Sequence, residues 1–238
     1  MKRSRILTVL VGVYLLMGIA TTAFATGGAT GYAIEGCYLS PNAVRSNYSV
    51  GAPVDESLSP LSRAATVLVY VTSPCDAEFR AKYPSSWAYQ ANAAVERADD
   101  GLYDLYGIDY LSVSQQSWSS SGSTMSALLT NAKTSCGLTY NGNLTADLMI
   151  AFTGKTTTDR YIGLANVSAP YALIKDGGYD QNAACVQHET GHTYGCSHAD
   201  KKWDTDTECI MYKYLTLENI DTFCADHDAV MQSHKNDY

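Results

Sequence analysis

Three of the five histidines in the 238-residue chain fall in one short run that reads H-E-x-x-H-x-x-G-x-x-H. His188 and His192 are four residues apart, so on a helix both imidazoles lie on one face and can share a metal ion. Gly195 can adopt a positive φ, end the helix and turn the chain back. That turn would bring His198 in as a third ligand. We therefore expect a three-histidine metal site.

Glu189 points to the chemistry of this site, because it lies beside the first ligand without being one itself. Three histidines and one water are the ligand set of a catalytic zinc ion, whose fourth position stays open. Zinc lowers the pKa of such a water from about 15.7 to roughly 7. A positioned general base adds roughly 10²–10⁴-fold in rate. We therefore predict a hydrolytic site with zinc as the cofactor, in which Glu189 is the general base that activates a zinc-bound water.

The motif alone leaves other interpretations open. H-E-x-x-H fixes only three positions, so a helix with two surface histidines is one alternative. A non-catalytic zinc-binding or interaction protein is a second, although such a protein has no need for Glu189. A zinc hydrolase that acts on a non-peptide amide is a third. Cys196 is a rival fourth ligand, but the turn around Gly195 directs its side chain away from the metal, which favours a disulfide.

The residues before the run predict strands and helices in alternation. Residues 65–72, 108–113 and 146–153 are apolar and rich in β-branched side chains, as buried strands are. A helix begins near Ser85 or Ser86, and its apolar stripe is Trp87, Ala91, Ala94, Val95, Ala98 and Leu102. A shorter helix carries Met125, Leu128, Leu129 and Ala132 on one face. This order predicts an α/β (α+β) fold with a mostly parallel twisted sheet and two crossover helices.

The residues from 161 onwards complete one domain. Short strands are expected at 161–167 and 171–175. A helix that starts near Gln181, with Asp180 as its candidate cap, carries the first two histidines. A last helix is expected at 225–233. The sequence shows no internal repeat and no second domain.

The first residues have the pattern of a secretory signal peptide, which we assign to residues 1–25. Lys2, Arg3 and Arg5 precede an apolar run, and Ala23-Phe24-Ala25 is a small-x-small cleavage site. A retained membrane anchor is the alternative. The remaining chain has 13 basic and 24 acidic residues, a net charge of −11, which argues against nucleic acid and anionic membranes as partners. We expect a secreted monomer with no membrane association in its mature form.

All seven cysteines follow that signal peptide, and an oxidising compartment would pair several of them. Because their number is odd, at least one thiol stays unpaired. A Cys196–Cys209 bridge would close the loop after the third histidine. Cys37 stands apart in the loop-rich residues 26–63. One hypothesis is that these residues are a short propeptide, cut after Arg63, whose Cys37 thiolate binds the zinc ion and so keeps the enzyme inactive. A disulfide between Cys37 and the rest of the protein and a free thiol are the alternatives.

The histidine run resembles the metzincin clan of zinc metallopeptidases, which share this motif and a methionine turn downstream of it. Cys209-Ile210-Met211 matches that turn, thirteen residues after His198. The resemblance covers about residues 65–238 and implies a zinc endopeptidase domain at 64–238, with an active-site helix, the methionine turn and a C-terminal helix. It implies that Met211 lies beneath the metal as an apolar floor; an ordinary core residue is the other interpretation.

Within the clan, the sequence is most similar to the adamalysin/reprolysin group. Residues 147–155 resemble its third-strand signature, and residues 163–167 resemble its antiparallel edge strand. The resemblance implies that this edge strand pairs with an extended peptide or protein substrate, since an open strand edge offers unpaired N–H and C=O groups. The implied substrate-binding residues are Gly163, Leu164, Ala165, Leu215 and Leu217. The sequence departs from the group where Ala199 follows the third histidine, since the group has an aspartate there.

Overall fold

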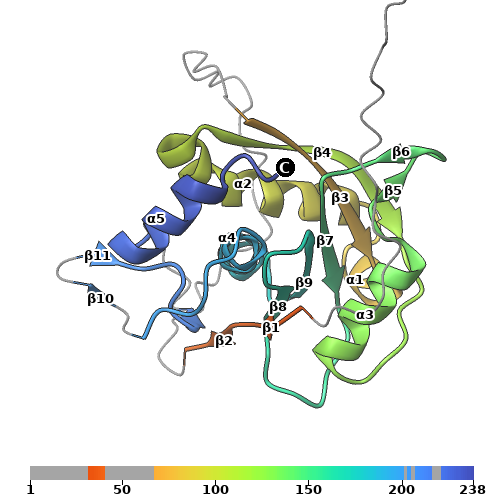
Figure 1. Ribbon diagram of the computed structural model, residues 1–238. Coiled ribbons are helices and arrows are strands. Elements are labelled where there is room, and N and C mark those ends of the chain that lie inside the picture. The colour runs from red at the N-terminus through yellow and green to blue at the C-terminus, as the bar shows by residue number, and fades with distance from the viewer. Residues whose placement is uncertain (1–31, 41–66, 201–202, 205–206, 216–220) are drawn as a thin grey trace, which may run out of the picture. The chain divides into compact units, whose positions relative to one another are not determined.

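The computed structural model describes residues 32–40, 67–200, 203–204, 207–215 and 221–238 (Figure 1). The predictions for the signal peptide, the Arg63 cleavage point and Leu217 lie outside the described residues. No helix in the described ranges is both long enough and apolar enough to cross a membrane.

A six-stranded sheet forms the centre of the fold, in the order β1-β8-β9-β7-β3-β4. Its strands are β1 (Ile34–Glu35), β3 (Val67–Cys75), β4 (Ile108–Ser117), β7 (Leu148–Thr153), β8 (Gly163–Asn166) and β9 (Tyr171–Lys175). Strand β3 runs parallel to β4 and β7, and β7 runs parallel to β9. Strand β8 is antiparallel to β9. The predicted mostly parallel sheet with one antiparallel strand near its edge is therefore confirmed.

One part of that prediction is wrong, because β8 is not the outermost strand. Residues Ile34 and Glu35 pair with β8 in antiparallel orientation, opposite Asn166 and Ala165 respectively. The loop-rich N-terminal residues thus supply a strand of their own. Their short strand carries no periodic pattern in the sequence, and its position is set by pairing across more than a hundred residues of chain.

Five helices are described: α1 (Ala77–Lys82), α2 (Trp87–Tyr106), α3 (Met125–Ser135), α4 (Tyr179–Thr193) and α5 (Ala225–His234). The predicted stripe of α2 is buried from Ala91 to Leu102. Helix α1 adds to the predicted elements, and its cap Asp76 accepts a hydrogen bond from the Phe79 N–H at 2.8 Å. Asp180 is not the cap of α4, because Gly178 takes that position with φ 96° and leaves Asp180 in the first turn.

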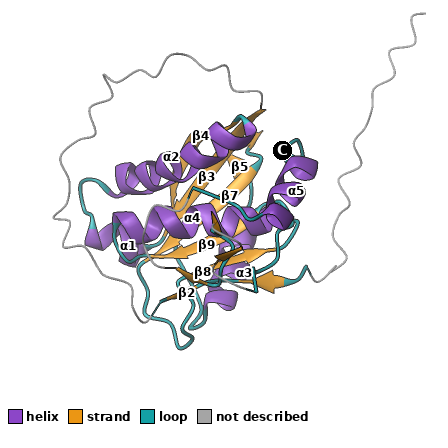
Figure 2. Cartoon of the chain, turned by 90° about the vertical axis from the view of Figure 1, so that its left-hand side faces the viewer, coloured by secondary structure: helices purple, strands orange, loops and turns teal. Residues whose placement is uncertain are grey.

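The sheet is covered on both faces, and β7 shows how. Its side chains alternate between two clusters of buried residues, as the two-residue period of a strand requires. Ile150 packs on the side of α2 and α4, whereas Met149 and Ala151 pack on the side of α3. Figure 2 views the sheet from the side of α2 and α4. A core on each face fixes the sheet, and the sheet in turn fixes α4, which carries the histidines.

Three short strand pairs complete the described elements. Strands β5 (Thr139–Tyr140) and β6 (Leu144–Thr145) pair antiparallel, as do β10 (Trp203–Asp204) and β11 (Thr207–Glu208). Strand β2 (Tyr38–Leu39) pairs parallel with β12 (Tyr214–Leu215). The last pair matters for the site, since it joins the N-terminal residues to the segment after the methionine turn. Strand β3 also continues through Ser73 and Pro74, which the sequence suggests as its end.

Candidate active site

The structure brings the three predicted histidines together. His188 and His192 lie fully buried on α4. Gly195 follows the helix with φ 95°, the positive value that its place in the motif requires. The chain then turns and places His198 beside the other two, so that one ring nitrogen from each histidine lies within 4.8 Å of the others.

The hydrogen bonds of the first two histidines leave the metal-facing nitrogens free. His188 Nδ1 lies 2.6 Å from the Ile210 carbonyl oxygen, and His192 Nδ1 lies 2.7 Å from that of Cys196. A carbonyl only accepts, so each Nδ1 carries the proton and each Nε2 carries the lone pair. Burial lowers the pKa of His188, and lowers the pKa of His192 to about 3, so both rings stay neutral.

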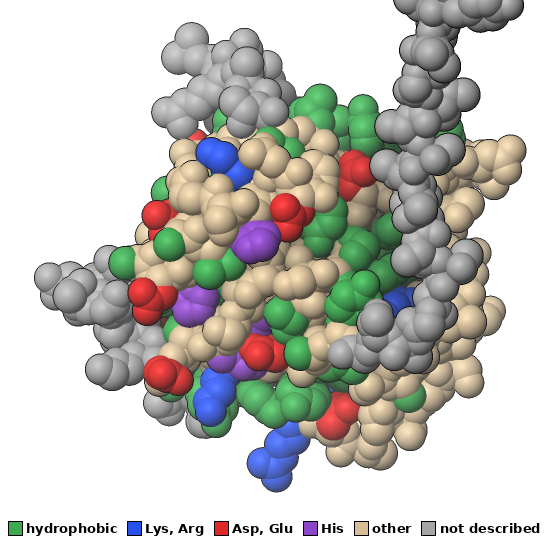
Figure 3. Space-filling view, in the orientation of Figure 1, with side chains coloured by type: hydrophobic (Ala, Val, Ile, Leu, Met, Phe, Trp, Pro, Cys, Tyr) green, Lys and Arg blue, Asp and Glu red, His purple; other side chains and the backbone are tan. Residues whose placement is uncertain are grey.

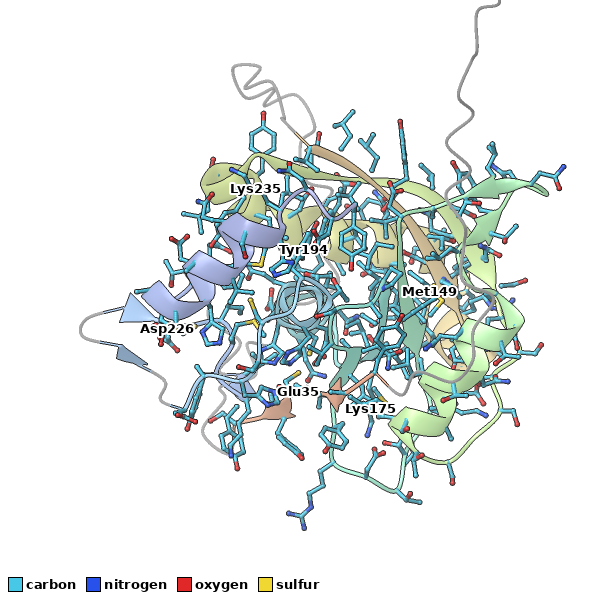
Figure 4. All side chains as sticks on the ribbon, in the orientation of Figure 1. Glu35, Met149, Lys175, Tyr194, Asp226 and Lys235 are labelled. Atoms are coloured by element: carbon cyan, nitrogen blue, oxygen red, sulfur yellow. The ribbon has the colours of Figure 1, made fainter. Side chains whose placement is uncertain are left out.

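The third histidine is oriented by a residue that the sequence did not single out. Glu35 Oε2 lies 3.3 Å from His198 Nδ1 and accepts a hydrogen bond from the His198 backbone N–H at 3.0 Å. Glu35 stands on β1, below α4 in the view of Figure 4. No spacing or periodicity links these two positions in the sequence, because the contact arises only from the pairing of β1 with β8.

These donors fit a zinc ion. The Nε2 atoms of His188, His192 and His198 are buried and have no hydrogen-bond partner among the described residues. Three neutral imidazoles that converge in this way are a catalytic zinc ligand set, and the groups behind them supply the outer support that such ligands need. The histidine side chains on the face turned to the viewer in Figure 3 lie at separate places beside acidic and hydrophobic ones, whereas His188 and His192 are fully buried.

Glu189 lies fully buried, and one of its carboxylate oxygens lies within 4.8 Å of a ring nitrogen of His188. Its Oε1 accepts a hydrogen bond from the Cys37 backbone N–H at 3.1 Å, and its Oε2 has no partner among the described residues. Burial raises the pKa of this carboxyl to about 8. A Cβ at position 163 would collide with Oε1, so the predicted substrate-strand residue Gly163 makes room for Glu189.

The methionine turn supports α4 from below the ligands. A Cβ at Gly191 would collide with Met211 Sδ, so the two residues touch directly. Met211 is fully buried, and its carbonyl accepts a hydrogen bond from the Ala199 N–H at 2.9 Å. The preceding residue, Ile210, holds His188 through its carbonyl oxygen. The turn therefore packs against the helix between its two ligands and also orients one of them.

Residues 32–40 lie along the site. Strand β1 covers β8, where Leu164 and Ala165 are buried, and β2 pairs with β12, where Leu215 is buried. Between the two strands the Cys37 side chain is fully buried, and its Sγ lies within 4.8 Å of ligand atoms of both His188 and Glu189. Burial raises the pKa of this thiol, and Cys185 Sγ lies 3.9 Å away.

All seven cysteines have free thiols in the structure. The expected Cys196–Cys209 bridge is not formed. The Cys196 thiol lies 3.9 Å from the His227 carbonyl oxygen, and Cys209 lies beside Cys224 and His227. Both thiols therefore lie beside residues at the start of α5, which sequence spacing alone does not reveal.

The chain was compared with known proteins by its sequence and by its fold. No curated protein matches its sequence. Among solved structures, a chaperone–substrate complex matches with a TM-score of 0.56 and 14% identity. This match covers 68% of this chain and 33% of that one. Archaemetzincin from Methanopyrus kandleri matches with a TM-score of 0.48 and 14% identity, over 74% of this chain and 99% of that one. At such identity the first likeness concerns the fold alone, and the match covers only about a third of that protein's length.

The sequence itself matches a family model over its central part. The model described as metallo-peptidase family M12 matches residues 64–225, which include the three histidines, Glu189 and the methionine turn. The match spans well over half of the chain. On this evidence the chain belongs to metallo-peptidase family M12.

Proposed function

We propose that this chain is a secreted zinc endopeptidase of metzincin type, most like the adamalysin/reprolysin group, that cuts peptide bonds in extended chains. One observation carries the proposal. Three histidine Nε2 atoms converge without partners among the described residues, and a carboxylate oxygen of Glu189, whose Oε2 also has no partner there, lies within 4.8 Å of a ring nitrogen of His188. A metal site that only supports a fold has no use for that carboxylate.

The three ligands His188, His192 and His198 are called the histidine cradle below. The residues around this cradle can perform the proton transfers of hydrolysis. Zinc, when bound, would lower the pKa of a coordinated water towards about 7 and polarise the scissile carbonyl. Glu189 Oε2 accepts the proton of the attacking water and then gives it to the leaving amine nitrogen.

The substrate we propose is an extended peptide that adds to β8. Gly163, Leu164 and Ala165 form the strand that such a peptide would pair with, and Leu215 lies on β12 at the other end of the segment. Residues 32–40 already pair with both strands, antiparallel to β8 and parallel to β12. The chain's own residues thus occupy the path proposed for the substrate.

This occupation supports the latency hypothesis for residues 26–63. Cys37 Sγ lies within 4.8 Å of a ring nitrogen of His188, and a cysteine thiolate is a good zinc ligand. Its backbone N–H also holds Glu189 Oε1, so the segment contacts both the metal cradle and the general base. We propose that residues 26–63 keep the enzyme inactive until they are removed after Arg63.

The test is cleavage of a random peptide pool, read by mass spectrometry. Residues 26–63 are removed from both proteins, so that latency does not hide activity, and one of the two also carries Glu189→Gln. We expect the first protein to cut and a chelator to stop it. We expect the Glu189→Gln protein to keep its zinc and to lose roughly 10²-fold or more in rate.

Two results would argue against the proposal. Equal cleavage by the two proteins would remove Glu189 from the mechanism. A protein that holds zinc and cuts no peptide, even without residues 26–63, would favour the alternative of a non-catalytic zinc-binding or interaction protein on the same fold.

A further inference from the structure

A second group of metal-ligating side chains lies outside the histidine cradle. Cys209 directly precedes the methionine turn, Cys224 immediately precedes α5, and His227 stands in the first turn of that helix. Their ligand atoms lie within 4.8 Å of one another, and all three residues are buried. None of them takes part in the proposed hydrolysis.

The distances suit a shared metal ion. His227 Nδ1 lies 2.8 Å from Cys224 Sγ and 3.5 Å from Cys209 Sγ. Bonds of about 2.3 Å to sulfur and about 2.1 Å to nitrogen place neighbouring ligands of a tetrahedral zinc about 3.5 Å apart. A small separation of the Cys224 and His227 side chains would therefore admit the ion.

One backbone donor already faces a sulfur of this group. The Cys224 backbone N–H donates to Cys209 Sγ at 3.2 Å. Backbone donors of this kind support metal-bound ligands and strengthen when the acceptor is charged. The spacing Cys-x-x-His, from 224 to 227, is also one that brings two ligands to the same ion at the start of a helix.

A fourth sulfur, that of Cys196, lies near the group, although outside the 4.8 Å that separates the three ligand atoms. Cys196 is fully buried, and its thiol lies 3.9 Å from the His227 carbonyl oxygen. Three cysteines and one histidine form a closed structural zinc set, in contrast to the open set of the histidine cradle. We propose that Cys196, Cys209, Cys224 and His227 bind a second, structural zinc ion that ties α5 to the methionine turn and to the segment before His198.

This inference does not rest on the proposed peptidase activity, since no residue of the group touches the general base or the substrate path. The rival interpretation is a disulfide between Cys209 and Cys224, with His227 packed against it. The two differ in metal content and in thiol state, so both can be measured on the folded full chain.

The first measurement counts zinc by native mass spectrometry on the purified full chain. We expect two zinc ions per wild-type chain and one in the Cys209→Ser/Cys224→Ser protein. The matched control, His188→Ala/His192→Ala, should also keep one, because it loses the other site. A wild-type count of one, or an oxidised Cys209–Cys224 pair found by thiol alkylation, overturns the proposal without any variant having to fold.

The second measurement identifies the ligands by cobalt substitution. All proteins carry Cys37→Ser, so that no sulfur can come from the N-terminal segment. We expect a thiolate-to-cobalt charge-transfer band that persists in His188→Ala/His192→Ala and in the conservative His227→Cys protein. Loss of the band in the first of these, or its persistence in Cys209→Ser/Cys224→Ser, would place the sulfur ligands elsewhere and overturn the proposal.

Discussion

At the scale of single residues, the site depends on which nitrogen of each histidine carries the proton. Backbone carbonyls of Ile210 and Cys196 fix this for His188 and His192. Glu35 takes the corresponding place behind His198. Two of these three supports come from the turn and the loop next to the motif, and the third comes from the far end of the described chain.

Gly191 gives a test of how tightly the methionine turn packs. Gly191→Ala should destabilise the protein by about 1–3 kcal/mol, because the added methyl group meets Met211 Sδ in a filled core. Met211→Ala in the same protein removes the colliding sulfur. The double variant should therefore lose less stability than the sum of the two single variants. Denaturant unfolding of the four proteins measures this coupling, and strict additivity would show that the two residues do not press on each other.

At the scale of elements, the N-terminal segment and β8 decide whether a substrate can reach the cradle. Strand β1 takes the hydrogen-bonding edge of β8, and β2 takes that of β12. Between them, position 36 has room only for glycine, because a Cβ there would collide with the Gly163 carbonyl oxygen. The segment therefore lies as close to β8 as a backbone allows.

Cys37→Ser tests whether this segment also restrains the metal. We expect peptide cleavage by the full chain to rise by roughly tenfold or more, because a serine hydroxyl is a far weaker zinc ligand than a thiolate. Cys136→Ser is the matched control, since that half-buried residue lies beside α3 and away from the cradle. An equal change in both variants, or none in either, would speak against Cys37 as the restraint.

At the scale of the whole molecule, buried charge sets how stability varies with pH. Asp99 on α2 is almost fully buried and accepts a hydrogen bond from the Tyr110 N–H at 2.6 Å, which links the helix to β4. Burial, opposed by that bond, raises the pKa of Asp99 to about 8. The folded protein therefore holds this proton more tightly than the unfolded chain does.

The sign of the pH effect follows from that difference. Below pH 4 both states hold the proton, and the contribution is fully present. As pH rises from about 4 to about 8, the unfolded chain releases the proton first, so Asp99 makes the fold progressively less stable, by at most about 1.4 kcal/mol per pH unit. Asp99→Asn should remove this slope, so that its free energy of unfolding, measured with urea, rises relative to that of the wild type between about pH 5 and about pH 8. Parallel stability curves for the two proteins would contradict this.

Much of the molecule was predictable because its signals are local. The histidine spacing, the glycine that ends α4 and the stripe of α2 all lie within a few turns of chain. Strand β9 has the bounds that its apolar run predicts. Such features follow from helix and strand periods, which need no knowledge of distant residues.

The remaining features are contacts between distant parts of the chain. Glu35 lies 163 positions from His198, and Cys37 lies 152 positions from Glu189. The residues around Glu35 and Cys37 are rich in turn formers and show no apolar period, so they predict a loop. Only the sheet order explains why this loop pairs with β8, and the sequence contains no local signal for that order.

The cover on β8 has a further consequence for how the molecule behaves in solution. An unpaired strand edge is a template for any extended chain, including another copy of the same protein. With β1 in place, the sheet ends in a strand of only two residues, which offers little to a neighbour. Removal of the N-terminal segment would expose the four residues of β8, so the step that frees this strand for substrate would also create a surface for self-association and self-digestion.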